Sequence, residues 1–367
     1  MRVTRWAAMG TAVALLLPFS TPAAATTPAN PAGMAILAGS TIVRADGTHV
    51  RLDLPRGTVA ETAAATPHGY LVAASTGDTS RLWLFPSAGA PRSVPLGTTL
   101  GVEHWTVTHD GSMVVATLPG PSATVGSHVM VAYALPSLRE HARVRFAAAW
   151  RDALLSSMGP LITGTVDRRI VANDLGGPSI SGIIGVWDPL TRNLSRSTAF
   201  AHSWGATRDG RALYRLDRYG PRGWRYQDIA SACVDLAPIT AAGQIPFRHT
   251  GLCGEFVTRL LIGIVSPGGS HAVVMELRNL VEIVFRTAVV RTADLHAGRW
   301  QPAWINEEYG DPDFWDTDST FLVKERNTGK YRRCGGDGRC LALRMPRVPG
   351  VEEGDMKPIE RAGFGGS

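Results

Sequence analysis

The segment Glu307–Asp318 brings six carboxylates together and is the first candidate for chemistry in this sequence. Calcium is bound in proteins by several oxygen ligands, which closely spaced carboxylates supply. Glu307, Glu308, Asp311 and Asp313 are therefore candidate calcium ligands, and Ca²⁺ is the only cofactor that the sequence suggests. The spacing lacks the glycine and the final glutamate of an EF-hand loop, so a solvated loop without metal is the alternative.

The same carboxylates could serve a second kind of chemistry. A glycosidase needs two carboxyl groups about 5 to 9.5 Å apart, one as an acid and the other as a base or nucleophile. Asp311 and Asp313, together with Glu307 or Glu308, supply the residue types. Sequence alone does not supply the distance, so this interpretation depends on where the fold places them.

An aromatic and basic segment is the candidate for binding. Tyr219, Arg222, Trp224 and Tyr226 lie within a glycine-rich stretch that favours an exposed loop. Aromatic rings stack on sugars, and arginine pairs with anionic groups. We therefore expect this patch to contact a glycan or an anionic partner.

Other catalytic motifs are missing from the sequence. No G-x-S-x-G nucleophile turn, no H-E-x-x-H zinc motif and no phosphate-binding G-x-x-x-x-G-K-S/T loop occurs. The ten histidines are dispersed rather than spaced as metal ligands. The absence of these three motifs favours a binding protein over a serine hydrolase, a zinc protease or a nucleotide hydrolase.

Four cysteines form an even set, which favours disulfides in an exported chain. Cys334 and Cys340 flank the turn sequence Gly-Gly-Asp-Gly, which would place them across a short hairpin. Of the three possible pairings, we expect Cys334 with Cys340 and Cys233 with Cys253.

The first 25 residues have the pattern of a secretory signal peptide. Arg2 and Arg5 precede an apolar run, and small residues end at Ala25. The run is shorter than the roughly 20 residues that span a bilayer, so we expect a secreted protein with no membrane span. Removal of the two arginines lowers the formal net charge from +6 to +4. The remaining arginines are scattered, so no nucleic-acid partner is expected.

The elements that would position these residues are short strands. After residue 33, β-branched and aromatic runs alternate with Gly, Pro, Asp and Ser, which predicts an all-β fold. Similar turns, each followed by an apolar strand, recur at positions 69, 111, 168, 210, 269 and 318. Their spacing is typical of four-stranded β-propeller blades. We predict a single propeller of about seven blades, with six blades or two β-sandwich domains as alternatives, and expect the hairpin 41–52 to close the ring with a C-terminal strand.

Two motifs resemble known propellers. The sequence Val-Trp-Asp-Pro-Leu-Thr at 186–191 resembles the Trp-Asp end of a WD40 strand, and the Ser/Thr-x-Asp/Gly-Gly turns resemble those of TolB-like propellers. The resemblance, to secreted bacterial WD40-like or TolB-like propellers, spans roughly residues 35 to 345. It implies a scaffold for binding more often than an enzyme.

The predicted organisation has four parts: a signal peptide at 1–25, a spacer at 26–33, a propeller domain at 34–346 and a flexible C-terminal tail at 347–367. The expected function is non-catalytic binding of an extracellular or envelope partner, either a protein or a glycan. The alternative is an extracellular hydrolase or lyase that acts on sugars or lactones.

Overall fold

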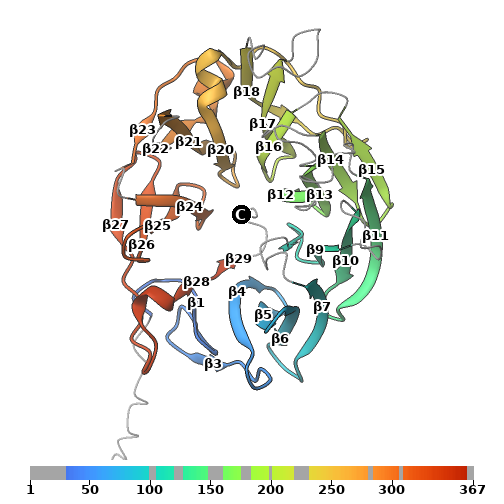
Figure 1. Cartoon of the computed structure of the whole chain (residues 1–367), viewed down its shortest axis with the longest axis vertical. Coiled ribbons are helices and arrows are strands. Elements are labelled where there is room, and N and C mark those ends of the chain that lie inside the picture. Colours follow the sequence, from blue (N-terminus) through green and yellow to red (C-terminus); the bar gives the residue numbers. More distant parts are fainter. Residues whose placement is uncertain are drawn as a thin grey trace, which may run out of the picture.

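Seven β-sheets are arranged around a central axis, which makes the chain a seven-bladed β-propeller (Figure 1). The computed structural model describes residues 30–98, 105–119, 127–147, 160–174, 183–197, 201–218, 231–279, 284–305 and 309–361. Among these residues six sheets have four strands and one has five. The all-β prediction, the single propeller and the preferred count of seven blades are confirmed.

The blades are numbered from the N-terminus, and the strands of each blade are named from the ring axis outward. The first blade contains β28 (Lys357–Pro358), β1 (Ile36–Ala38), β2 (Thr41–Val43) and β3 (His49–Arg51). The second contains β29 (Glu360–Arg361), β4 (Val59–Thr66), β5 (Gly69–Thr76), β6 (Thr79–Pro86) and β7 (Arg92–Thr98). The third contains β8 (Trp105–Val107), β9 (Met113–Pro119), β10 (Ser127–Ala134) and β11 (Arg139–Ala147).

The remaining blades follow the same order. The fourth contains β12 (Pro160–Val166), β13 (Arg169–Asp174), β14 (Ile183–Asp188) and β15 (Asn193–Arg196). The fifth contains β16 (Ala201–Ala206), β17 (Arg211–Arg218), β18 (Ser231–Pro238) and β19 (Leu252–Gly254). The sixth contains β20 (Leu260–Val265), β21 (His271–Asn279), β22 (Val284–Arg291) and β23 (Ala303–Trp304), and the seventh β24 (Tyr309–Trp315), β25 (Thr320–Glu325), β26 (Tyr331–Gly335) and β27 (Cys340–Ala342). The short helical turns are η1 (Glu255–Arg259), α1 (Thr292–His296) and η2 (Glu353–Asp355).

The two ends of the described chain close the ring together. The hairpin β2–β3 continues from β1, and β28 pairs antiparallel with β1 as the innermost strand of the first blade. β29 then pairs parallel with β4 and lies near the ring axis (Figure 1). The predicted closure by the hairpin 41–52 and a C-terminal strand is confirmed.

This closure corrects the predicted domain boundary at residue 346. Lys357–Pro358 and Glu360–Arg361 are strands of the first two blades, and Met356 and Ile359 are buried at 3% and 1% exposure. The propeller therefore extends to residue 361. The segment is rich in Gly, Pro and charged residues, a composition that predicts a flexible tail even though a few buried apolar residues anchor it.

The repeated turns occupy equivalent places in six blades, between the first long strand and the second. In three of them, a Ser or Thr hydroxyl accepts a hydrogen bond from the backbone N–H that starts the next strand. The pairs are Thr108 with Met113 (3.0 Å), Thr207 with Arg211 (3.1 Å) and Ser266 with His271 (3.1 Å). Neighbouring turns also contact each other, because Gly268 N donates to the Asp318 carboxylate at 2.8 Å. In these three blades the motif therefore links the two strands through the turn, and the Gly268–Asp318 contact joins the sixth and seventh blades.

The hydrophobic core lies between blades rather than in one central mass. Trp187 packs with Met130 of the third blade and Ile170 of its own, and Trp204 packs with Val265 and Val274 of the sixth blade. These side chains are buried, so each sheet covers the face of its neighbour. A closed ring leaves every such face covered on both sides.

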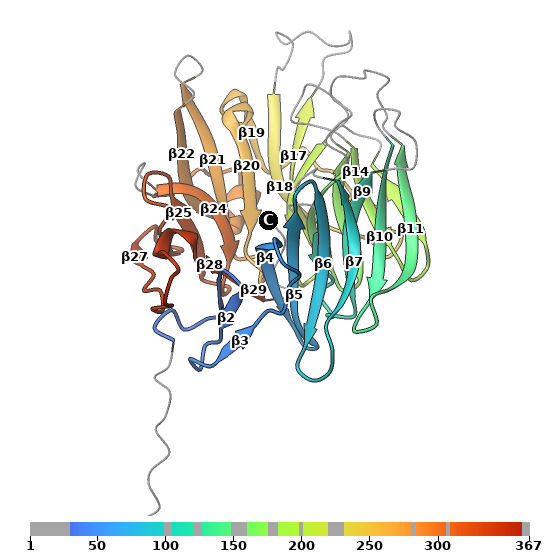
Figure 2. The ribbon, with the colours of Figure 1, turned by 60° about the horizontal axis from the view of Figure 1, so that its bottom comes forward.

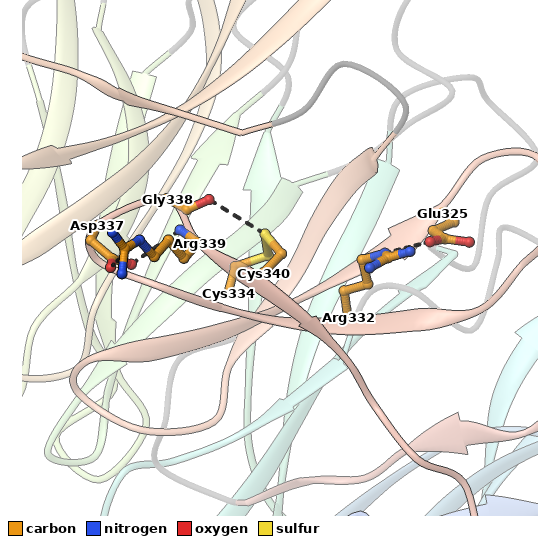
Figure 3. Close-up of a disulfide and its surroundings, with 7 residues drawn as sticks. All are labelled: Glu325, Arg332, Cys334, Asp337, Gly338, Arg339 and Cys340. Carbon is orange, nitrogen blue, oxygen red and sulfur yellow. Dashed lines mark hydrogen bonds and ion pairs between the residues drawn. A yellow bond between two sulfur atoms is a disulfide. The ribbon is translucent and has the colours of Figure 1, made fainter.

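Both predicted disulfides are present. Cys233 pairs with Cys253 across β18 and β19, and Cys334 pairs with Cys340 across β26 and β27, with Cα–Cα distances of 4.1 and 4.0 Å. The second bridge spans the base of the turn that carries Asp337, as Figure 3 shows. Each therefore fastens the outermost strand of a blade to its neighbour. Within the described part of the chain, no helix is long and apolar enough to cross a membrane.

Candidate functional site

A cleft of about 760 Å³ lies where the ring closes, between the β2–β3 hairpin and the segment that leads from β27 to β28. This segment is the red chain at the edge of the ring beside β1 and β3 in Figures 1 and 2. The residues lining the cleft are Asn30, Pro31, Val43, Gly47, His49, Arg344, Met345, Pro346, Arg347, Val348, Val351, Glu353 and Met356. We refer to it as the closure cleft. Its volume lies in the range of small-molecule sites.

Local sequence builds the wall formed by the hairpin. Gly47 has φ +83° in the turn Asp46-Gly47-Thr48, a backbone conformation that glycine adopts without strain. The Asp46 carboxylate accepts hydrogen bonds from the Thr48 hydroxyl at 2.7 Å and from Thr48 N at 2.9 Å, which rigidify the turn and lower the pKa of Asp46. The buried Asn30 side chain donates to Met34 O at 2.8 Å, and Asn30 N donates to Ala45 O at 3.1 Å, which fixes the incoming chain against the hairpin.

The opposite wall is the connection between β27 and β28. Leu343 N donates to Tyr331 O at 2.9 Å, which holds the beginning of this connection against the seventh blade. Val351 N donates to Val348 O across a turn that contains Gly350 at φ +77°. Met345, Val348 and Val351 pack partly buried on a core cluster that includes Met356. The cleft therefore has an apolar floor anchored in the core.

The charges on the cleft are uneven. Both arginines of its lining, Arg344 and Arg347, are exposed. Glu353 lies 3.8 Å from the Lys330 ammonium, which offsets its negative charge. An arrangement of apolar floor and cationic rim can bind a ligand that combines apolar groups with a carboxylate or phosphate.

A second polar cluster lies near the ring axis. Asp313 is on β24, and Glu360 is on β29. Lys357 on β28 donates to Glu61 O of β4 at 2.6 Å and so joins the first two blades. The Tyr331 hydroxyl is hydrogen-bonded to Asp313, and the Lys324 ammonium lies 5.7 Å from the centre of the Tyr331 ring.

The acidity of these groups reflects their burial. Burial raises the pKa of Asp313, although the Tyr331 hydroxyl and the positive charges of Lys324 and Lys357 act in the opposite direction. Burial raises the pKa of Glu360 well above its usual range, and the negative charge of Asp313 adds to this effect. The same two causes raise the pKa of Tyr331. Two carboxyl groups of raised pKa can exchange protons, but they also fit a role in holding the last strands in place.

The predicted calcium ligands are only partly visible. Asp313 lies in the strand β24. The sequence predicts either a calcium site or a solvated loop for this segment. Glu307 and Glu308 lie outside the described residues, as does the side chain of Asp311. Among described residues, no group of three or more His, Cys, Asp or Glu could hold a metal ion. Calcium binding by this segment stays a prediction.

The predicted aromatic patch cannot be placed. Tyr219, Arg222, Trp224 and Tyr226 belong to the connection between β17 and β18, which lies outside the described residues. Their role in binding a glycan or an anionic partner likewise stays a prediction.

Comparison with known proteins gives the fold. No family model matches the chain, and no curated protein matches it. A prolyl endopeptidase structure superposes with a TM-score of 0.52 at 12% identity, over 89% of this chain and 52% of that one. The likeness is one of fold. The chain spans about half the length of that endopeptidase.

Two further structures are propellers of the kinds that the motifs resembled. The WD40 domain of coronin from Toxoplasma gondii superposes with a TM-score of 0.47 at 11% identity, over 78% of this chain and 70% of that domain. TolB from Acinetobacter baumannii gives 0.41 at 11% identity, over 82% of this chain and 74% of TolB.

Sequence reasoning missed the closure cleft. It assigned residues 347–367, which include Arg347, to a flexible tail, and it gave no role to Arg344 within the predicted propeller domain. One signal was available, because Val348, Val351, Met356 and Ile359 place apolar residues at intervals through that segment. A solvated tail has no reason to carry such a series.

Proposed function

We propose that the chain is an exported, non-catalytic binding module and that its extracellular or envelope partner docks in the closure cleft. The observation that carries this proposal is the cleft itself, which combines an apolar floor with exposed cations. The wall that holds these cations is anchored at both ends, by Leu343 and by β28. A site on such an anchored segment needs little ordering when a partner binds, which favours affinity.

Export is supported by two independent features of the chain. Residues 1–25 have the pattern of a signal peptide, and the four cysteines form two disulfides. Expression of the full chain in a secreting host tests this part of the proposal. We expect mature protein in the medium or envelope with Thr26 at its N-terminus, whereas retention of residues 1–25 would contradict it.

Partner capture tests the cleft. The mature protein is immobilised, proteins and glycans from culture medium and envelope extracts are captured, and each bound partner is identified, purified and titrated against the protein. Val348→Glu places a charge on the apolar floor, and Leu190→Glu makes the same kind of change at a side chain 54% exposed on the fourth blade. We expect the affinity of the partner to fall about tenfold or more for Val348→Glu and to stay unchanged for Leu190→Glu. Equal affinity for both variants would exclude the cleft as the docking site.

The carboxyl pair near the ring axis supports a second candidate, a hydrolase or lyase that acts on sugars or lactones. Asp313 and Glu360 both have raised pKa values, as an acid catalyst requires. Assays of the mature protein with glycan fragments and lactones, with calcium and with EDTA, test this candidate. Turnover that Asp313→Asn abolishes would favour the hydrolase or lyase. If no substrate is turned over, the binding module remains the better supported function.

A further inference from the structure

Two arginines of the closure cleft stand without a partner among the residues that the structure describes. Arg344 and Arg347 are exposed on its lining, and neither side chain makes a hydrogen bond or ion pair within the described part of the chain. Many other arginines of the molecule are paired, as Arg299 is with the buried Asp294 at 2.7 Å. An arginine that remains unpaired beside a cleft is available to a ligand carboxylate or phosphate.

The acidic residue within the described lining does not offset this charge. Glu353 lies beside Lys330, with both side chains about half exposed, and a pair of that kind is nearly neutral when viewed from the cleft. The cleft therefore presents a net positive charge. That charge would attract an anionic segment during encounter and would disfavour a basic one.

The apolar floor limits the kind of anion. Val348 and Met345 lie on the same connection as the arginines, one residue away from Arg347 and Arg344 respectively. Each arginine on this wall is thus followed directly by an apolar residue. A simple inorganic anion would use only the arginines, whereas an extended peptide presents carboxylates and apolar side chains at a similar short repeat.

The described lining and the residues before it in the sequence do not supply such an acidic segment. Asn30 lines the cleft, and the residues that precede it include no aspartate or glutamate. They would leave both arginines unpaired if they folded back. Within the described lining and the segment before Asn30, no carboxylate other than that of Glu353 is present, so both arginines are open to a carboxylate of another molecule.

We propose that the closure cleft binds an acidic, extended peptide segment of the partner protein, with carboxylates on Arg344 and Arg347 and apolar side chains on Met345 and Val348. This inference rests on the proposed binding function and names the chemistry of its partner. Two charge-assisted contacts to arginine supply orientation, and the apolar floor supplies burial.

Fluorescence anisotropy with a short labelled peptide of alternating glutamate and leucine tests the inference on the mature, disulfide-intact protein. A peptide of the same length with glutamine in place of glutamate is the ligand control. Arg344→Gln with Arg347→Gln removes the two cations from the cleft. The matched protein control is Arg139→Gln with Arg145→Gln, which removes two exposed arginines from β11 on another blade.

We expect the glutamate peptide to bind wild type and the β11 variant equally, and to bind the cleft variant about tenfold more weakly or worse. Higher ionic strength should weaken the binding, and the glutamine peptide should bind as poorly to wild type as the glutamate peptide does to the cleft variant. Equal binding to the cleft and β11 variants, or no binding of the glutamate peptide to wild type, would overturn the inference. If a captured partner still depends on Val348 in that case, the binding function stands and only the acidic chemistry fails.

Discussion

Glu360 shows how a single residue connects ring closure to pH. It lies on β29, where burial and the negative charge of Asp313 act on its carboxyl group, while Tyr331, Lys324 and Lys357 act on Asp313. Because burial raises the pKa of Glu360, the folded protein retains this proton to a higher pH than the unfolded chain does. Its contribution to stability is therefore complete below the unfolded pKa of about 4.3 and is lost as pH rises through the raised folded value.

Glu360→Gln should remove this pH dependence. We expect the free energy of unfolding of the variant to exceed that of wild type at about pH 8 and to approach it at about pH 5, because glutamine cannot ionise. Denaturant unfolding at both pH values provides the measurement.

Glu325→Gln is the matched control for that measurement. Hydrogen bonds from Thr328 and then Arg332 lower the pKa of Glu325, so its ionised form stabilises the fold above the unfolded pKa and that stability is lost as pH falls. The control should therefore be less stable than wild type at about pH 8, opposite in sign to Glu360→Gln. The same sign for both variants would contradict the assignment at Glu360.

At the level of elements, both disulfides perform the same task in different blades. Each joins directly opposed residues on the third and fourth strands, so that the outermost strand of the blade cannot separate. The outermost strand has only one neighbour in its sheet and is otherwise the first to fray. β19 and β27 have three residues each, so each bridge adds a covalent link to a short edge strand.

The two bridges should differ in their effect on stability because they close loops of different length. Cys233 and Cys253 are separated by 20 residues, and Cys334 and Cys340 by 6. Replacing each pair by alanine should cost about 3 kcal/mol for the longer loop and about 2 kcal/mol for the shorter one. Denaturant unfolding of the two double variants measures the difference, and a larger loss for Cys334 and Cys340 would contradict the loop-length argument.

At the level of the whole molecule, closure depends on two short strands from one end of the chain. β28 completes the first blade and β29 extends the second, while Met356 and Ile359 anchor the segment in the core. Burial of two such side chains contributes about 3 to 6 kcal/mol, a large share of the stability of a typical domain.

Removal of residues 347–367 should therefore open the ring. We expect the truncated protein to unfold with lower cooperativity and to associate through the exposed edge of β1, which loses its partner β28. Removal of 362–367 alone retains every described contact and serves as the control. Calorimetry and light scattering provide the measurements, and a truncated protein that unfolds like the control would show that closure needs no C-terminal strand.

The propeller could be predicted from sequence because its information is local and repeated. Each blade from the second to the seventh is marked in the sequence by its own turn, at 69, 111, 168, 210, 269 and 318. Cys334 and Cys340 likewise flank the hairpin that they bridge. The closure cleft could not be predicted in the same way. Val43 and Val348 are some 300 residues apart, and only the closed ring brings their segments to one cleft.

Closure of the ring by β28 and β29 also sets the order of events during folding. Ile36 can begin its strand as soon as it is made, yet its partner Pro358 is produced only after six other blades. Until then the inner edge of β1 is unpaired. The pairing of β1 with β28 is non-local and slow, so it forms last. At high concentration the C-terminal segment of a neighbouring copy can reach that edge first, so exchange of β28 and β29 between molecules is the expected misfolding route when the protein is made too fast.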